Sequence, residues 1–177
     1  MTQMSLATTS PVVSPAPRAL GAAGAATLAA GLLLPLQAAA ASKEVGVWYD
    51  DTGKGAVEIF SCGRKLCGRI FWLKDPLNKD GTPLYDGYNP RSDLRSRPIC
   101  GLQVLGDLER QPDGTWDAGW VYDPKVGKSY DAAISLSGSN TLVLTGYKGV
   151  KFLSKSFTWT RAPRNLPKCS SSKASSR

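Results

Sequence analysis

Apolar and polar residues alternate with a period of two along most of the chain after residue 41, and no long apolar stripe has the period of a helix. Gly, Pro, Asn, Asp and Ser interrupt the alternation at short intervals, as they do at turns between strands. The pattern therefore predicts eight short strands, at Glu44–Asp50, Ala56–Ser61, Cys67–Lys74, Leu102–Glu109, Thr115–Tyr122, Ser129–Leu136, Thr141–Tyr147 and Leu153–Arg161.

Eight consecutive strands joined by short turns predict an all-β fold, an eight-stranded antiparallel up-and-down barrel that leaves no sheet edge. An open sandwich of two sheets is the alternative architecture. The alternation places apolar side chains together on the faces expected to point inward. These groups are Val57, Ile59, Ile70 and Trp72; Trp116, Ala118, Trp120 and Tyr122; Tyr130, Ala132, Ile134 and Leu136; and Phe157 with Trp159.

One connection, residues 75–98 between the third and fourth predicted strands, is much longer than the others and has no regular period. Loops of this length in compact domains are usually functional or disordered. We expect a lid or wall over one mouth of the barrel; the alternative is an ordered plug that fills the barrel and binds nothing. The loop is rich in side chains that could meet a ligand: Tyr85, Tyr88, Asn89, Arg91, Arg95 and Arg97.

The first 41 residues have the layout of a cleavable export signal. Residues 19–41 carry no charge, Arg18 precedes them, and Pro35 breaks the apolar run before the alanines at 38–41. An uncleaved membrane anchor is the alternative, because the run is long enough to span a bilayer. We expect a bacterial periplasmic or secreted protein with a signal peptide over 1–41, a barrel domain over 42–161 and a disordered basic tail over 162–177.

Export would make the cysteines candidates for disulfide bonds. Cys62 and Cys67 flank four residues, and a four-residue hairpin loop would place these two cysteines directly opposite each other, with Phe60 opposite Arg69. We therefore predict a Cys62–Cys67 disulfide. Cys100 would then pair with Cys169 by elimination; alternatively Cys100 is a buried small apolar residue and Cys169 is free or intermolecular.

The formal net charge of +8 belongs largely to the C-terminal end of the chain. A nucleic-acid-binding protein more often concentrates its charge on a folded face, so we expect no nucleic-acid partner. The tail is expected to be solvated, although it could rest on an anionic surface of the cell envelope. The basic residues at this end, with no acid among them, are Arg161, Arg164, Lys168, Lys173 and Arg177.

Gly46 and Trp48 stand in the first predicted strand, and Trp159 and Arg161 stand in the last. These residues at the two ends of the predicted barrel look like the lipocalin closure. In that closure the Trp ring lies across the base of the barrel and the Arg packs on its face, a cation–π contact worth about 1 kcal/mol.

A longer series of motifs runs through the predicted barrel. The motifs are Gly46-x-Trp48, Cys67-Gly68-Arg69-Ile70, Asp86-x-x-Asn89-Pro90, Arg97-Pro98, Gly101-Leu102-Gln103-Val104-Leu105, Gly119-Trp120-Val121-Tyr122-Asp123-Pro124, Gly127-Lys128-Ser129-Tyr130 and Thr158-Trp159-Thr160-Arg161. This series, which covers about Val45 to Arg161, resembles an exported bacterial family, the domain of unknown function 2147. The resemblance implies a lipocalin-like barrel of the cell envelope with no established activity, so it supplies no catalytic residues.

Several kinds of chemistry are excluded by the residues themselves. The chain contains no histidine, which rules out Ser-His-Asp and Cys-His catalysis and histidine-ligated zinc. Gly127-Lys128-Ser129 imitates the end of a phosphate-binding loop, but Tyr122 stands where that loop needs its first glycine. Asp75, Asp80 and Asp86 do not have the spacing of an EF-hand. We expect no catalytic residue, no cofactor and no metal.

An aromatic interior with a few polar groups at its mouth is typical of a small-molecule pocket. We therefore expect a monomeric, non-enzymatic barrel that binds a small apolar or amphipathic molecule in the cell envelope. The alternative is a structural or interaction module whose barrel is filled by its own side chains; an enzyme that uses Tyr, Asp or Arg groups near the loop is a third hypothesis. The candidate ligand-binding residues are Trp72, Asn89, Arg91, Arg97, Trp120, Tyr122 and Tyr130.

Overall fold

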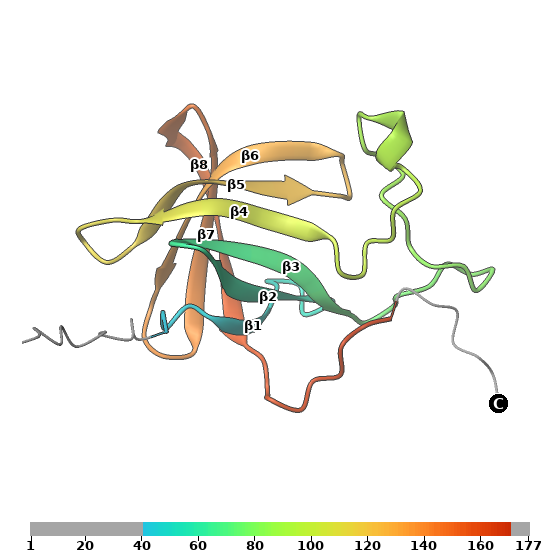
Figure 1. Ribbon diagram of the computed structural model, residues 1–177, viewed down its shortest axis with the longest axis horizontal. Coiled ribbons are helices and arrows are strands. Elements are labelled where there is room, and N and C mark those ends of the chain that lie inside the picture. The colour runs from blue at the N-terminus through green and yellow to red at the C-terminus, as the bar shows by residue number, and fades with distance from the viewer. Residues whose placement is uncertain (1–40, 171–177) are drawn as a thin grey trace, which may run out of the picture. The chain divides into compact units, whose positions relative to one another are not determined.

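The computed structural model describes residues 41–170, which fold into a closed barrel of eight antiparallel strands (Figure 1). Each strand pairs with the next along the chain, and β8 pairs with β1 to close the barrel. The predicted eight-stranded up-and-down barrel is thus confirmed. The strands are β1 Gly46–Tyr49, β2 Gly55–Cys62, β3 Lys65–Leu73, β4 Gln103–Arg110, β5 Trp116–Asp123, β6 Lys128–Leu136, β7 Thr141–Lys148 and β8 Val150–Arg161; a short 3-10 helix, η1, spans Ser92–Leu94.

The connections divide the barrel into two ends. β1, β3, β5 and β7 finish at one end, which carries the long loop 74–102 and the turns around residues 50–54, 124–127 and 149. We call this the loop end. The opposite end carries the other three hairpin turns and the last residue of β8, and we call it the Arg161 end. In Figure 1 the long loop that carries η1 extends beyond the strands at the loop end.

The predicted export signal and residues 171–177 of the predicted tail lie outside the described residues. Within residues 41–170, no helix is long and apolar enough to cross a membrane. Residues 162–170 form neither helix nor strand.

Large apolar side chains fill the barrel toward the Arg161 end. All are less than 2% exposed, and their burial stabilises the fold by roughly 1.5–3 kcal/mol each. Trp116 and Trp159 extend the same cluster. These fully buried side chains are Trp48, Ile59, Leu66, Leu105, Leu108, Ile134 and Leu142.

Arg161 closes its end of the barrel. Its guanidinium carbon lies 4.0 Å from the centroid of the buried Trp48 ring, the contact that the lipocalin-like closure implies. The same guanidinium donates hydrogen bonds to the carbonyl oxygens of Lys43, Val45 and Ser139. Gly46 has a φ of +137°, and a Cβ there would lie 2.8 Å from Arg161 Nη1. The glycine therefore leaves room for the guanidinium.

The β2–β3 hairpin differs in register from the prediction. Cys62 pairs with Lys65, and Phe60 pairs with Cys67, so the turn contains two residues and not four. Gly63 takes a φ of +71°, which a tight two-residue hairpin turn requires. The register therefore moves by two residues, and a shift of two keeps the side chains from Val57 to Ile70 on their predicted faces.

Both disulfide bonds are present. Cys62 and Cys67 are diagonal neighbours across the hairpin and are bonded, as predicted. Cys100 is bonded to Cys169, the pairing expected by elimination. The Cys169 N–H also donates to the Phe71 carbonyl at 2.8 Å, so the segment after β8 returns to the loop end and is attached there.

Candidate functional site

A buried polar network fixes the long loop against β5. The Asp86 side chain is fully buried, and its carboxylate accepts hydrogen bonds from the Tyr122 hydroxyl at 2.6 Å and from Asn89 Nδ2 at 2.8 Å. Arg97 donates to the same carboxylate through Nε at 2.9 Å and through Nη2 at 2.8 Å. Such a charge-assisted, two-point contact is both strong and geometrically specific.

The backbone of the loop closes around this network. The Asp86 N–H donates to the Arg97 carbonyl, and the Asn89 N–H donates to the Asp86 carbonyl, both at 3.0 Å. Arg95 Nε donates to the Asn89 carbonyl at 2.8 Å. Burial, and next the hydrogen bond to Asp86, raise the pKa of Tyr122, which therefore stays a neutral donor at physiological pH.

The network thus brings together three of the predicted ligand-binding residues, Asn89, Arg97 and Tyr122. Their polar atoms bond to one another and to Asp86, which compensates the charge of Arg97. These four residues position the loop, and none of them presents an unpaired charge to the interior. Arg91, the fourth predicted residue of the loop, lies apart on the surface, where Nη2 forms an ion pair with Asp93 at 2.7 Å.

The barrel interior is lined differently at the loop end. The side chains of Trp159, Leu142 and Ile134 are buried inside the barrel. Because side chains alternate along each strand and paired residues share a face, the strand pairing also shows which residues nearer the loop end point inward. There the inward-facing apolar side chains are only partly buried, and Tyr130 is 37% exposed. We call all the inward-facing residues at this end the mouth residues. They are Ile70, Val121, Tyr130, Gly146, Lys155 and Phe157.

Glycines at two depths of the barrel show where interior space is left. A Cβ added at Gly68 would lie 3.0 Å from Val57 and Leu105, and one at Gly119 would lie 2.7 Å from Leu108. A Cβ added at Gly146 would lie 3.9 Å from Val121 Cγ1 and 4.0 Å from the Lys155 carbonyl oxygen, which is ordinary van der Waals contact. The interior is therefore tightly filled near the Arg161 end, whereas the mouth is packed less tightly and can accept a Cβ at position 146.

Lys155 supplies a cation at the mouth. It pairs with Gly146 and lies two residues before Phe157 and four before the inward-facing Trp159, on the same face of β8. Its Nζ lies 4.9 Å from the centroid of the Phe157 ring. The sequence contained the signal for this residue, because the alternation that places Trp159 and Phe157 inward extends to Lys155.

Trp72, predicted to line the interior, lies on the outer side of the barrel. Val57 pairs with Ile70 while Ala56 pairs with Trp72, so Phe71 is an extra residue in β3. A bulge of one residue reverses the face of the residues beyond it. Trp72 consequently shares a face with Tyr49, and the two rings contact edge to face with centroids 5.6 Å apart.

Trp120 also faces outward, contrary to the prediction, and so does Tyr122, which alternates with the inward-facing Val121 and bonds to Asp86 of the long loop. The β5–β6 register shifts between Trp116 and Gly119, which breaks the alternation that would place Trp120 on the face of Trp116. The Trp120 ring covers Gly106, where an added Cβ would come within 2.5 Å of the indole. Its Nε1 donates to Asp107 Oδ2 at 2.9 Å.

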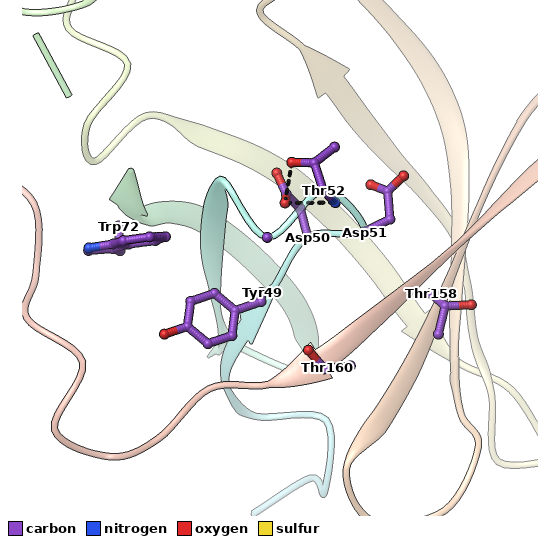
Figure 2. Close-up of a pocket in the computed structure, with 8 residues that line it drawn as sticks. Tyr49, Asp50, Asp51, Thr52, Trp72, Thr158 and Thr160 are labelled. Atoms are coloured by element: carbon purple, nitrogen blue, oxygen red, sulfur yellow. Dashed lines mark hydrogen bonds between the residues drawn. The ribbon is translucent and has the colours of Figure 1, made fainter. Parts of the chain in front are cut away.

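A groove of about 500 Å³ lies beside Tyr49 and Trp72, outside the barrel (Figure 2). Figure 2 shows the two rings close together, next to the β1–β2 turn that carries Asp50 and Asp51. Asp50 Oδ1 accepts hydrogen bonds from both the N–H and the hydroxyl of Thr52, so this carboxylate stabilises the turn. Within residues 41–170, no group of three or more acidic or cysteine side chains could hold a metal ion.

Comparison with solved structures finds protein HP1028 from the human pathogen Helicobacter pylori, described as belonging to the lipocalin family. It is 25% identical to this chain with a TM-score of 0.59, and the match covers 68% of this chain and 83% of that protein. No curated protein matches the sequence. The family model of uncharacterized proteins conserved in bacteria (DUF2147) matches residues 46–161, the whole barrel from Gly46 to Arg161. The chain therefore belongs to the DUF2147 family and folds as a lipocalin-like barrel.

Proposed function

We propose that the protein binds a small anionic amphiphile, such as a molecule with a fatty acyl chain and an acidic head, at the mouth of the barrel. The observation that carries this proposal is the looser packing around Gly146, among partly buried apolar side chains and one lysine. There an added Cβ makes only ordinary van der Waals contacts, whereas deeper in the barrel, at Gly68 and Gly119, it would come within 3.0 Å of core atoms. An apolar pocket with one polar group that fixes orientation is the usual composition of a small-molecule site.

The mouth residues suit the two parts of such a ligand. The apolar part would pack against Val121, Tyr130 and Phe157, which are only partly buried in the protein alone. The acidic head would accept a charge-assisted hydrogen bond from Lys155, an exposed cation. In this arrangement the ligand completes the burial that the protein's own side chains leave unfinished.

The long loop would contribute rigidity to this site. Because Asp86 binds Tyr122 of β5 and Arg97 of the loop together, the loop is fixed in one position before a ligand arrives. A site that is already ordered loses less conformational entropy on binding. Asn89, Arg97 and Tyr122 are thus proposed to support binding indirectly.

We propose that the protein binds its ligand without catalysis, as a monomer in the bacterial periplasm or outside the cell. Two disulfide bonds support an oxidising compartment. The absence of histidine removes the commonest general base, and Asp86 is occupied by its own partners. Arg164 and Lys168, exposed residues of the segment that Cys169 attaches at the loop end, are proposed to lie near the anionic surfaces of the envelope.

A second candidate is a structural or interaction module with a filled barrel. The fully buried core around Trp48 favours it, since that half of the barrel holds no ligand. The two functions differ in one respect that can be measured: only the first requires room for a ligand at Gly146.

The test measures binding of a fluorescent fatty acid and of the matching uncharged alcohol. Gly146→Leu, which fills the mouth, should weaken both probes at least tenfold. Lys155→Gln should weaken only the acid, by about fivefold to tenfold, a change of roughly 1–1.4 kcal/mol. Gly87→Ala and Arg64→Gln, both at exposed positions and the second at the opposite end of the barrel, serve as controls.

Failure of the acid to bind the unmodified protein would exclude this proposal and leave the filled-barrel module. Equal binding by Gly146→Leu would show that the probe lies elsewhere, for example in the groove beside Trp72. Circular dichroism and thermal unfolding of each variant establish that the fold is retained.

A further inference from the structure

The tip of the β7–β8 hairpin exposes two large apolar side chains that do not contribute to the core. Phe152 is 94% exposed and Leu153 is 73% exposed. Gly146 pairs with Lys155 while Lys148 pairs with Val150, so residues 151–154 of β8 lie opposite a single residue of β7. We call residues 151–154 the arch. In Figure 1 this tip projects past the neighbouring strands.

The base of the arch is fixed although its apolar residues are free of the core. Asp117 forms an ion pair with Lys151 and accepts a hydrogen bond from the Tyr147 hydroxyl at 2.8 Å. Asp131 Oδ2 accepts a hydrogen bond from the Gly149 N–H at 2.8 Å. The arch is therefore held in an orientation that exposes its apolar side chains to solvent.

The charges around the arch are suited to an anionic surface. Two acids beside the tip, Asp117 and Asp131, are both bonded to groups of the tip itself, and Asp113 also interacts with Lys151. Lys148 is exposed beside them, and Lys125 and Lys128 lie on or next to the neighbouring β5–β6 turn. Exposed apolar side chains flanked by lysines are typical of segments that lie at the interface of an anionic membrane.

We propose that the arch docks the protein on a bilayer that contains anionic phospholipids. Phe152 and Leu153 enter the boundary between headgroups and acyl chains, and Lys148 contacts lipid phosphate. Membrane docking would explain why Phe152 and Leu153 are apolar although they are exposed to solvent. Polar side chains at these two positions would leave the fold unchanged. The arch residues are distinct from the mouth residues, so docking does not depend on the proposed binding of an amphiphile.

The test uses the chain from Ser42 onward, which contains the whole barrel and both disulfides. Cosedimentation is measured with vesicles of equal parts phosphatidylglycerol and phosphatidylcholine, and with vesicles of phosphatidylcholine alone. We expect binding to the anionic vesicles that falls as salt is raised. The double variant F152S/L153S should bind at least tenfold more weakly, and Lys148→Gln about fivefold more weakly.

Two control variants give the result its specificity. Phe152→Leu keeps an apolar side chain and should keep binding. Arg64→Gln removes a charge from the β2–β3 turn, at the Arg161 end, and should leave binding unchanged.

Four results would overturn the proposal. The unmodified protein could fail to bind anionic vesicles, F152S/L153S could bind as well as the unmodified protein, or binding could vanish when the basic residues of the tail are neutralised while the arch is intact. Conversion of a dimer to a monomer by F152S/L153S would also overturn it, since the arch would then contact a second copy.

Discussion

Removal of the Asp86 carboxylate should release the long loop. In Asp86→Ala, the Tyr122 hydroxyl and the Asn89 amide lose a buried anionic acceptor, and Arg97 loses its compensating charge. Loss of one partner of a buried ion pair costs about 3–5 kcal/mol. The Arg97 side chain is 36% exposed and can be hydrated, so we expect the lower part of that range, about 3 kcal/mol.

The assay combines urea unfolding with amide hydrogen exchange. The free energy of unfolding should fall by about 3 kcal/mol, and the Asn89 and Arg97 amides should exchange about a hundredfold faster. Asp93→Asn is the matched control, because it breaks an exposed ion pair in the same loop and should change neither quantity measurably. A loss below about 1 kcal/mol in Asp86→Ala with unchanged exchange would show that the network does not fix the loop.

Three further predictions concern stability. Burial raises the pKa of Tyr147 to about 12, and the hydrogen bond to Asp117 is the second cause. The stabilisation that comes from this shift is fully present below about pH 10 and is lost as the pH rises through the folded-state pKa. Between pH 9 and pH 11 the free energy of unfolding should therefore fall less in Tyr147→Phe than in the unmodified protein. Replacing Cys100 and Cys169 by serine removes a disulfide bond between residues 69 positions apart, which constrains the unfolded chain. The free energy of unfolding should fall by up to about 4 kcal/mol. No change would exclude a structural role for this bond. Arg161→Ala should cost about 2 kcal/mol in the same measurement, and Arg161→Lys should recover less than half of it, since an ammonium cannot reproduce the stacking on Trp48 and the hydrogen bonds to three carbonyls.

The strands and their order could be predicted because they depend on local alternation. Gly46, Trp48 and Arg161 were recognisable as a closure because they resemble the pattern at the two ends of a lipocalin barrel, and Arg161 does pack on the Trp48 ring. The bond between Cys62 and Cys67 could be predicted from spacing alone, although the hairpin turn is shorter than expected.

The faces of Trp72 and Trp120 could not be predicted, because each follows a bulge. A single extra residue such as Phe71 reverses the face of the residues after it, and no signal in the sequence marks where the extra residue lies. The contact between Asp86 and Tyr122 joins residues 36 positions apart, and only the folded barrel brings them together. Lys155 was within reach of the alternation argument, which included its neighbour Phe157.

The mouth of the barrel is tested most directly by nuclear magnetic resonance of the labelled protein during titration with a long-chain fatty acid. We predict that the largest chemical-shift changes occur at Val121, Tyr130, Gly146 and Phe157, while the amides of the core near Trp48 are unaffected. Shifts confined to Tyr49 and Trp72 in the outer groove, or no shifts at saturating fatty acid, would contradict the account.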